Sequence, residues 1–265
     1  MMKLHGFMAA SIVLMSSAGA ALAQETASSA MVTDRPGLLF SSSTVGPGAF
    51  VVELGVPQVT LVEDSDVKVR LTSLVALLRY GVGRNFELRL GAPVYNKLHA
   101  ESGPFHDDES GFGDVEVGAK WHLLDNAGSR PSFALIPSVI LPTGDDQFSA
   151  GDPVYQLNAM AEWTLPKNWS AGALVGVLNG PDGDGRYYQE TVGLSAGQQM
   201  SKAWSAYGEA VYAATGLEGA GDSAFLGAGI KYLVADDLQL DLSFDRGLTG
   251  DSPDWLFGLG VSAGF

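Results

Sequence analysis

Apolar and polar side chains alternate with a period of two residues along several long stretches of this chain, and no other feature limits its fold as strongly. The alternation is clearest over residues 85–95, 112–123, 238–245 and 255–265. In residues 238–245 every even position is leucine or phenylalanine, and every odd position is glutamine, aspartate or serine. Successive side chains of a strand point to opposite faces of a sheet, so this pattern predicts β-strands with one apolar face.

Weaker alternation extends the prediction to twelve strands, which we expect near residues 49–61, 67–80, 85–95, 112–123, 132–142, 153–164, 169–179, 187–199, 204–215, 224–234, 238–245 and 255–265. They are mostly ~10–13 residues long, which is close to the ~9–11 residues with which a tilted strand crosses a bilayer and exceeds the ~5–6 residues of a typical soluble strand. A backbone in lipid must satisfy its hydrogen bonds internally, so strands cross only as a closed barrel. We therefore predict an all-β fold, an antiparallel transmembrane β-barrel. A soluble exported sandwich, with the same alternation turned inside out, is the alternative.

The N-terminus predicts export. Lys3 is followed by an apolar stretch over residues 6–21, and Ala21-Leu22-Ala23 fits the small-residue cleavage site of a secretory signal. We expect residues 1–23 to be a cleaved signal peptide and residues 24–48, rich in Ser, Ala, Thr, Gly and Pro, to be a periplasmic N-terminal segment. Residues 49–265 would then form the barrel.

The connections between the predicted strands alternate in length. Tight joins fall at 81–84, 165–168, 200–203 and 235–237, with a longer one at 124–131, whereas the alternate joins are mostly longer and strongly acidic, at 62–66, 96–111, 143–152, 180–186, 216–223 and 249–253. Outer-membrane barrels have short periplasmic turns and longer outside loops. We therefore expect the protein in the cell outer membrane, with its acidic loops facing outward among lipid and lipopolysaccharide, where they disfavour anions.

Composition and motifs exclude several classes of function. Thirty Asp and Glu residues against fifteen Lys and Arg give a formal charge of −15, which argues against a nucleic-acid-binding protein. The absence of cysteine excludes thiol nucleophiles, thiolate metal sites and disulfides. His99, His106 and His122 lack metal-ligand spacing, and no phosphate-binding glycine motif is present. We expect no catalytic residue, metal or cofactor; a membrane lipase using His122 is the disfavoured enzymatic alternative.

The polar faces of the predicted strands carry charges of both signs. If the apolar faces meet lipid, the charged side chains point into the lumen, and the candidate lumen-lining residues are Glu53, Arg70, Glu87, Arg89, Asp114, Glu116, Lys120, Glu162, Glu209, Lys231, Asp241 and Asp245. These charges could line a narrow aqueous path or pair and close it, because a twelve-stranded barrel lies between small filled barrels and wide porins. We expect passive uptake of small solutes; the alternative is a closed structural or adhesive barrel.

The last predicted strand ends on Phe265, with apolar residues at 263, 261, 259 and 257. A terminal phenylalanine closing an alternating strand resembles the signal by which the barrel-assembly machinery of the outer membrane recognises its clients. We therefore expect Phe265 to contact that machinery.

Several short motifs resemble one family along nearly the whole predicted mature chain. They are TDRP at 33–36, GPGAF at 46–50, ELG at 53–55, GFGDVEVGAKW at 111–121 and LPTGD at 141–145. In order and spacing they are similar to the outer-membrane family named for the meta pathway of phenol degradation, often labelled transporters. The resemblance implies a barrel that helps aromatic or other small hydrophobic compounds across the outer membrane, and it supplies no catalytic residues.

Overall fold

The computed structural model describes residues 31–64 and 67–265, so the predicted signal peptide and residues 24–30 lie outside the described residues. The described chain forms β1 (Phe50–Asp64), β2 (Val67–Gly83), β3 (Phe86–Ser102), β4 (Phe105–Gly111), β5 (Val115–Leu124), β6 (Ser132–Leu141), β7 (Val154–Leu165), β8 (Trp169–Asp182), β9 (Gly185–Gln199), β10 (Trp204–Thr215), β11 (Ser223–Ala235), β12 (Leu238–Gly247) and β13 (Trp255–Gly264). Two short 3-10 helices, η1 (Asp146–Phe148) and η2 (Pro166–Asn168), lie between strands. This part of the chain forms no helix that is long and apolar enough to span a membrane.

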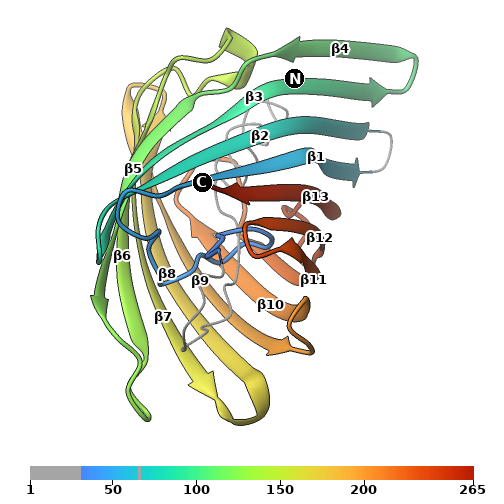
Figure 1. The fold of residues 1–265 in the computed structure, drawn as a ribbon. Coiled ribbons are helices and arrows are strands. Elements are labelled where there is room, and N and C mark those ends of the chain that lie inside the picture. Colours follow the sequence, from blue (N-terminus) through green and yellow to red (C-terminus); the bar gives the residue numbers. More distant parts are fainter. Residues whose placement is uncertain (1–30, 65–66) are drawn as a thin grey trace.

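Twelve of these strands close into a barrel (Figure 1). Each pairs antiparallel with its neighbours, β3 pairs with β5, and β1 closes the ring against β13, with Val51 opposite Gly264. Strand β4 pairs with β3 and stands outside the ring. The predicted all-β fold, an antiparallel barrel of about twelve strands, is confirmed.

The two faces of the wall follow the alternation of the sequence. Leu240 and Leu242 of β12 are 46 % and 47 % exposed on the outside, whereas Asp241 and Asp245 are buried inside. The same holds for Leu194 of β9, which is 65 % exposed. A wall with an apolar outer face and a polar inner face is the arrangement that lipid requires of a barrel.

The barrel has two different ends. The short-turn end carries the residues that join β2 to β3, β7 to β8, β9 to β10 and β11 to β12, together with the C-terminus. The long-loop end carries the connections 142–153, 216–222 and 248–254. Exposed aromatic side chains face outward near the short-turn end, where Phe50 packs on Tyr80 and Trp204 on Tyr232 with 4.5 Å between ring centroids. Aromatic girdles of this kind mark the membrane interfaces of barrels.

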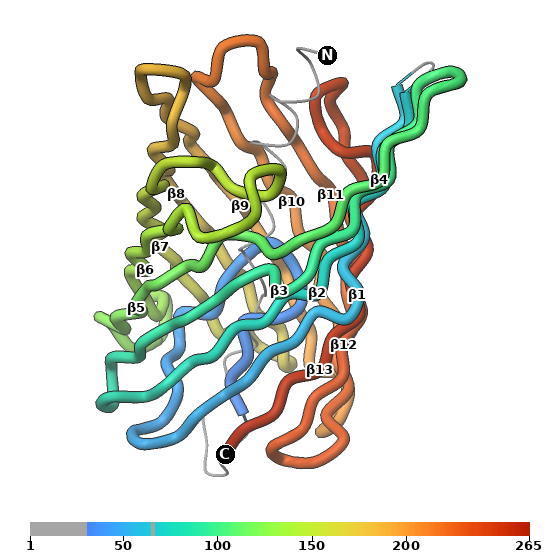
Figure 2. The backbone as a smooth tube through the Cα atoms, turned by 90° about the horizontal axis from the view of Figure 1, so that it is seen from above, coloured from blue at the N-terminus to red at the C-terminus, as the bar shows by residue number. Residues whose placement is uncertain are grey.

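The structure corrects the predicted loops at the long-loop end. Residues 96–111 form a β-hairpin rather than a loop, and β8 and β9 are joined by residues 183–184 alone rather than by 180–186. The ends of β1, β2 and β3 run on together with β4 as a projecting sheet, which extends beyond the rest of the barrel in Figure 2. Strand pairing satisfies backbone polar groups in water as well as in lipid, so strands need not end at the membrane surface.

Candidate functional site

Residues 31–48, here called the lumen segment, lie inside the ring of strands (Figures 1 and 2). The sequence predicted a periplasmic segment over 24–48, so for its described part this prediction is corrected. Both ends of the segment are tied to the short-turn end: Met31 N donates to Asp236 O at 3.3 Å, and Gly48 N donates to Gly81 O at 2.7 Å. Between these points most of the segment is buried, with Asp34, Leu39 and Ser41 fully covered.

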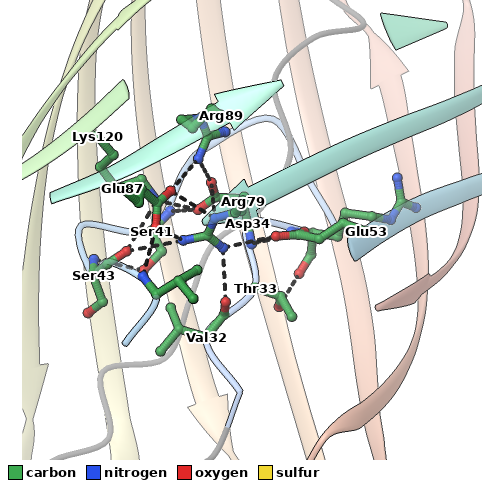
Figure 3. Close-up of polar contacts among 12 residues, drawn as sticks. Val32, Thr33, Asp34, Ser41, Ser43, Glu53, Arg79, Glu87, Arg89 and Lys120 are labelled. Atoms are coloured by element: carbon green, nitrogen blue, oxygen red, sulfur yellow. Dashed lines mark hydrogen bonds and ion pairs between the residues drawn. The ribbon is translucent and has the colours of Figure 1, made fainter. Parts of the chain in front are cut away.

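Asp34 of the lumen segment lies among three cationic side chains of the wall (Figure 3). Its carboxylate accepts hydrogen bonds from Arg89 and from Lys120 Nζ, the latter at 2.7 Å, and lies 3.6 Å from Arg79 Nε. These groups are at most 3 % exposed. A buried charge is tolerated when it is paired and hydrogen-bonded, and Asp34 meets this requirement only while the segment is inside the barrel.

Two wall carboxylates complete this cluster. Arg79 donates to Glu53 Oε1 at 2.9 Å and to Glu87 Oε1 at 2.8 Å, and therefore bridges β1 and β3 (Figure 3). Glu53 also accepts the backbone N–H of Asp34, and Glu87 accepts that of Val45 at 2.8 Å. The wall therefore binds both the side chain and the backbone of the segment.

Carboxylates on the opposite wall bind the segment as well. Glu209 of β10 accepts Leu38 N at 2.9 Å, and Glu162 of β7 accepts Ser42 N at 2.6 Å. Arg35 forms a 3.0 Å ion pair with Asp241 of β12. The lumen segment is thus held from several sides by charge-assisted hydrogen bonds, which are about twice as strong as neutral ones.

Glycines in the wall make room for the segment. A Cβ on Gly81 would lie 2.0 Å from the backbone oxygen of Gly46, and one on Gly260 would lie 2.3 Å from Arg35 Nε. A Cβ on Gly193 would meet Leu39 at 2.9 Å. A Cβ at these places would displace the backbone at Gly46 or the side chains of Arg35 and Leu39, so the wall and the segment fit each other closely.

Two apolar clusters lie inside the barrel. The segment cluster joins Leu38, Leu39 and Phe40 to wall residues Ile136, Met160, Leu174, Val211 and Phe225. The loop-side cluster, nearer the long-loop end, consists of Ile140, Val154, Leu178 and Tyr187, with Ala150 and Leu217 packed against it from the loops. The interior therefore contains apolar side chains beside its charges.

Ten of the twelve candidate lumen-lining residues are buried: Glu53, Glu87, Arg89, Asp114, Lys120, Glu162, Glu209, Lys231, Asp241 and Asp245. Glu116 is half-buried on the inner face with Lys120. Where their contacts are given, most of the buried groups hold the lumen segment and do not line an open path. Most of these charges therefore pair with one another or with the lumen segment.

Arg70 is the exception, because its side chain is exposed. The inner residues of β2 are odd-numbered, and Leu71 packs with Leu98 and Phe148 beneath the projecting sheet. Arg70 is therefore on the wet outer face. Arg79, which the sequence analysis missed, is the inner arginine of this strand. A one-residue error in strand phase moves a side chain to the opposite face.

Asp114 also corrects the prediction, because it precedes β5 and holds a loop. Its carboxylate accepts the backbone N–H groups of Thr143 and Gly144 at 3.0 and 2.9 Å, and that of Ala150 at 2.8 Å. Three bonds from one buried carboxylate fix the connection 142–153 over the long-loop end.

Asp222 has a similar role in the connection 216–222. It accepts hydrogen bonds from the Tyr212 hydroxyl and, at 3.0 Å, from Thr215 N. These two bonds, the hydroxyl first, lower the pKa of the Asp222 carboxyl below its ordinary value. Within the described residues, no group of three or more His, Cys, Asp or Glu side chains is arranged to hold a metal ion.

The family model described as "Putative MetA-pathway of phenol degradation" matches residues 33–265. In fold, the chain is similar to an outer membrane channel from Pseudomonas putida F1 (TM-score 0.62, 17 % identity, covering 84 % of this chain and 98 % of that one). It is also similar to the translocator domain of the autotransporter NalP from Neisseria meningitidis (TM-score 0.57, 13 % identity, covering 83 % of this chain and 89 % of that one). A third similar structure is the NanC porin (TM-score 0.52, 10 % identity, covering 81 % of this chain and 98 % of that one). No curated protein matches the chain in sequence. The structural likenesses show the fold alone, a barrel of the outer-membrane type. The family match spans the described chain from Thr33 to its end, and the protein belongs to this MetA-pathway phenol-degradation family.

Proposed function

We propose that this protein is an outer-membrane channel for passive uptake of small solutes, with a preference for hydrophobic and aromatic ones. The observation that carries the proposal is that the interior of the barrel holds the lumen segment at one end and an apolar cluster toward the other (Figure 2). The lumen segment occupies it from the short-turn end, so a wide aqueous pore does not fit the geometry. The loop-side cluster, which is buried beneath the loops, is the apolar region that a solute entering from the other end would meet. The name of the family supports aromatic compounds as the solute class.

The proposal orients the protein with its short-turn end in the periplasm and its long-loop end outside, against lipid and lipopolysaccharide. Acidic residues crowd the long-loop end, including Asp107 and Asp108 on the projecting sheet. Phe265 fits contact with the barrel-assembly machinery, because its side chain is 78 % exposed while its backbone pairs with Phe50.

The test is entry of the aromatic dye N-phenylnaphthylamine into cells that produce the protein, since the dye fluoresces once it passes the outer membrane. We expect faster entry than in cells lacking the protein. Leu178→Asn places an amide in the loop-side cluster and should slow entry severalfold, whereas exposed Asp146→Asn should leave it unchanged. Equal entry with and without folded protein in the outer membrane would refute uptake of this class.

A closed structural barrel is the second candidate, favoured by the dense bonding of the lumen segment. Single-channel recording separates the two functions. A protein that gives no current, admits no dye and is confirmed as folded would be a structural barrel.

A further inference from the structure

Charge inside the barrel is unevenly balanced. In the part of the chain that the structure describes, eight Asp and Glu side chains but only five Arg and Lys side chains are buried. Around Asp34 the signs balance, because Asp34, Glu53 and Glu87 lie among Arg79, Arg89 and Lys120. The surplus negative charge therefore lies elsewhere in the interior.

Part of this surplus lies on β10 and β12, on either side of one glycine. Glu209 is directly opposite Gly227 of β11, and Gly227 is directly opposite Asp245 of β12. A Cβ on Gly227 would lie 1.7 Å from Asp245 Oδ1 and 3.3 Å from Glu209 Cγ. Since the glycine adds no side chain, the two carboxylates face the same space, and each residue is only 3 % exposed.

Two oxygen atoms at this place lack partners. Asp245 Oδ1 and the Tyr207 hydroxyl form no hydrogen bond, and both are buried, since the Tyr207 residue is only 6 % exposed. The Tyr207 hydroxyl lies near the Glu209 carboxylate, because one point beside Gly37 lies 2.7 Å from that hydroxyl and 2.8 Å from Glu209 Oε1. The ion pairs between described residues include neither Glu209 nor Asp245. A buried polar atom without a partner costs about 1–3 kcal/mol, and a charged one costs more.

We propose that Glu209, Asp245 and Tyr207 form a binding site for a calcium ion. Two carboxylates balance a divalent charge, and a set made only of oxygen atoms suits Ca²⁺, which completes its six to eight ligands with water or backbone oxygens. Mg²⁺ demands a near-ideal octahedron and gives up its bound waters reluctantly, so a buried site suits it less well than it suits Ca²⁺. The ion would also fix Glu209 in the position in which it accepts the Leu38 N–H.

The test is a titration of CaCl2 into folded, chelator-treated protein in detergent, followed by calorimetry and by Tb³⁺ luminescence excited through tyrosine. We expect one saturable site that Ca²⁺ fills in preference to Mg²⁺. Glu209→Gln and Asp245→Asn should each weaken binding at least tenfold, and their combination should abolish that site. Tyr207→Phe should weaken binding severalfold and reduce Tb³⁺ emission.

The control is Glu116→Gln, which removes another carboxylate of the inner face and leaves the acidic loops intact. It should bind Ca²⁺ as the wild type does, so that binding by the loops is separated from binding at Glu209. Absence of a saturable site in folded wild-type protein would overturn the proposal and indicate that the two carboxyl groups share a proton. Wild-type affinity in the double variant would overturn it equally. Tyr207→Phe keeps both carboxylates and serves as the second variant if the double variant fails to fold.

Discussion

Neutralising Asp34 should release the lumen segment from the barrel. In the wild type, Asp34 is the segment's only carboxylate within the described residues, and it pairs with Arg79, Arg89 and Lys120 of the wall. In Asp34→Asn the side-chain oxygen can still accept the N–H of Ser41, but the charge is lost. The three cations then keep the wall carboxylates as charged partners, and Arg79 and Lys120 keep hydrogen bonds to backbone oxygens of the segment. The barrel itself is closed by its strand ladders and should remain folded.

The size of the effect follows from the burial of the cluster. Removing one partner of a buried ion pair costs about 3–5 kcal/mol. Asparagine preserves the shape and one hydrogen bond, so we take about 3 kcal/mol for the loss. Each 1.4 kcal/mol is a factor of about ten in an equilibrium constant, so the withdrawn population should rise about a hundredfold.

The absence of native cysteine makes the measurement direct. Ser41→Cys places a thiol on the buried part of the segment, and a water-soluble maleimide reacts with it only when the segment withdraws. When opening and closing are fast, the labelling rate follows the withdrawn population. We expect about a hundredfold faster labelling when Asp34→Asn is added, and little change when Glu116→Gln is added. An increase below threefold in folded protein would refute the reasoning.

Three further perturbations test other parts of the structure. Gly81→Ala should speed labelling of the same thiol reporter, because its Cβ would meet a segment backbone oxygen at 2.0 Å, whereas Gly83→Ala has open space around it and should have no effect. Asp114→Ala removes the acceptor of three backbone N–H groups, which at about 1–3 kcal/mol per orphaned group should free the connection 142–153 and expose it to proteinase K. Because the pKa of Asp222 is lowered, its stabilising effect is complete above the unfolded value near 3.9 and is lost as pH falls through the folded pKa. The protection of the loop that Asp222 holds against hydrogen exchange should therefore fall below about pH 4. In Asp222→Asn the loop should be poorly protected both above and below that pH.

The barrel wall could be predicted from the sequence because lipid and lumen impose opposite demands on neighbouring residues. The alternation along β12 and β13 survives intact, so these strands were placed within a few residues. Where a strand leaves the membrane, its outer face meets water instead of lipid and can carry charged side chains. In the projecting sheet the apolar side chain of Leu71 faces inward and Arg70 faces water, so a rule derived for lipid selected Arg70 in place of Arg79.

The position of the lumen segment could not be predicted, because it depends on contacts between residues far apart in the chain. Asp34 and Arg35 have partners on β2, β3, β5 and β12, and no local period marks such a pattern. One available signal was a charged Asp-Arg pair within an otherwise uncharged stretch of serine, glycine and leucine. Another was the number of glycines on the inner faces, because wall positions without a side chain leave room for a chain segment inside the barrel.

Both ends of the lumen segment are anchored on the same rim, by Met31 at the β11–β12 turn and by Gly48 beside the β2–β3 turn. Within the described residues, the segment is therefore a loop that enters and leaves the barrel by one opening and does not thread the ring of strands. Its described residues can be inserted after the ring of strands has closed, and withdrawn again, through that one opening. Insertion is therefore separable from barrel closure, and the finished wall can act as a template on which the segment folds.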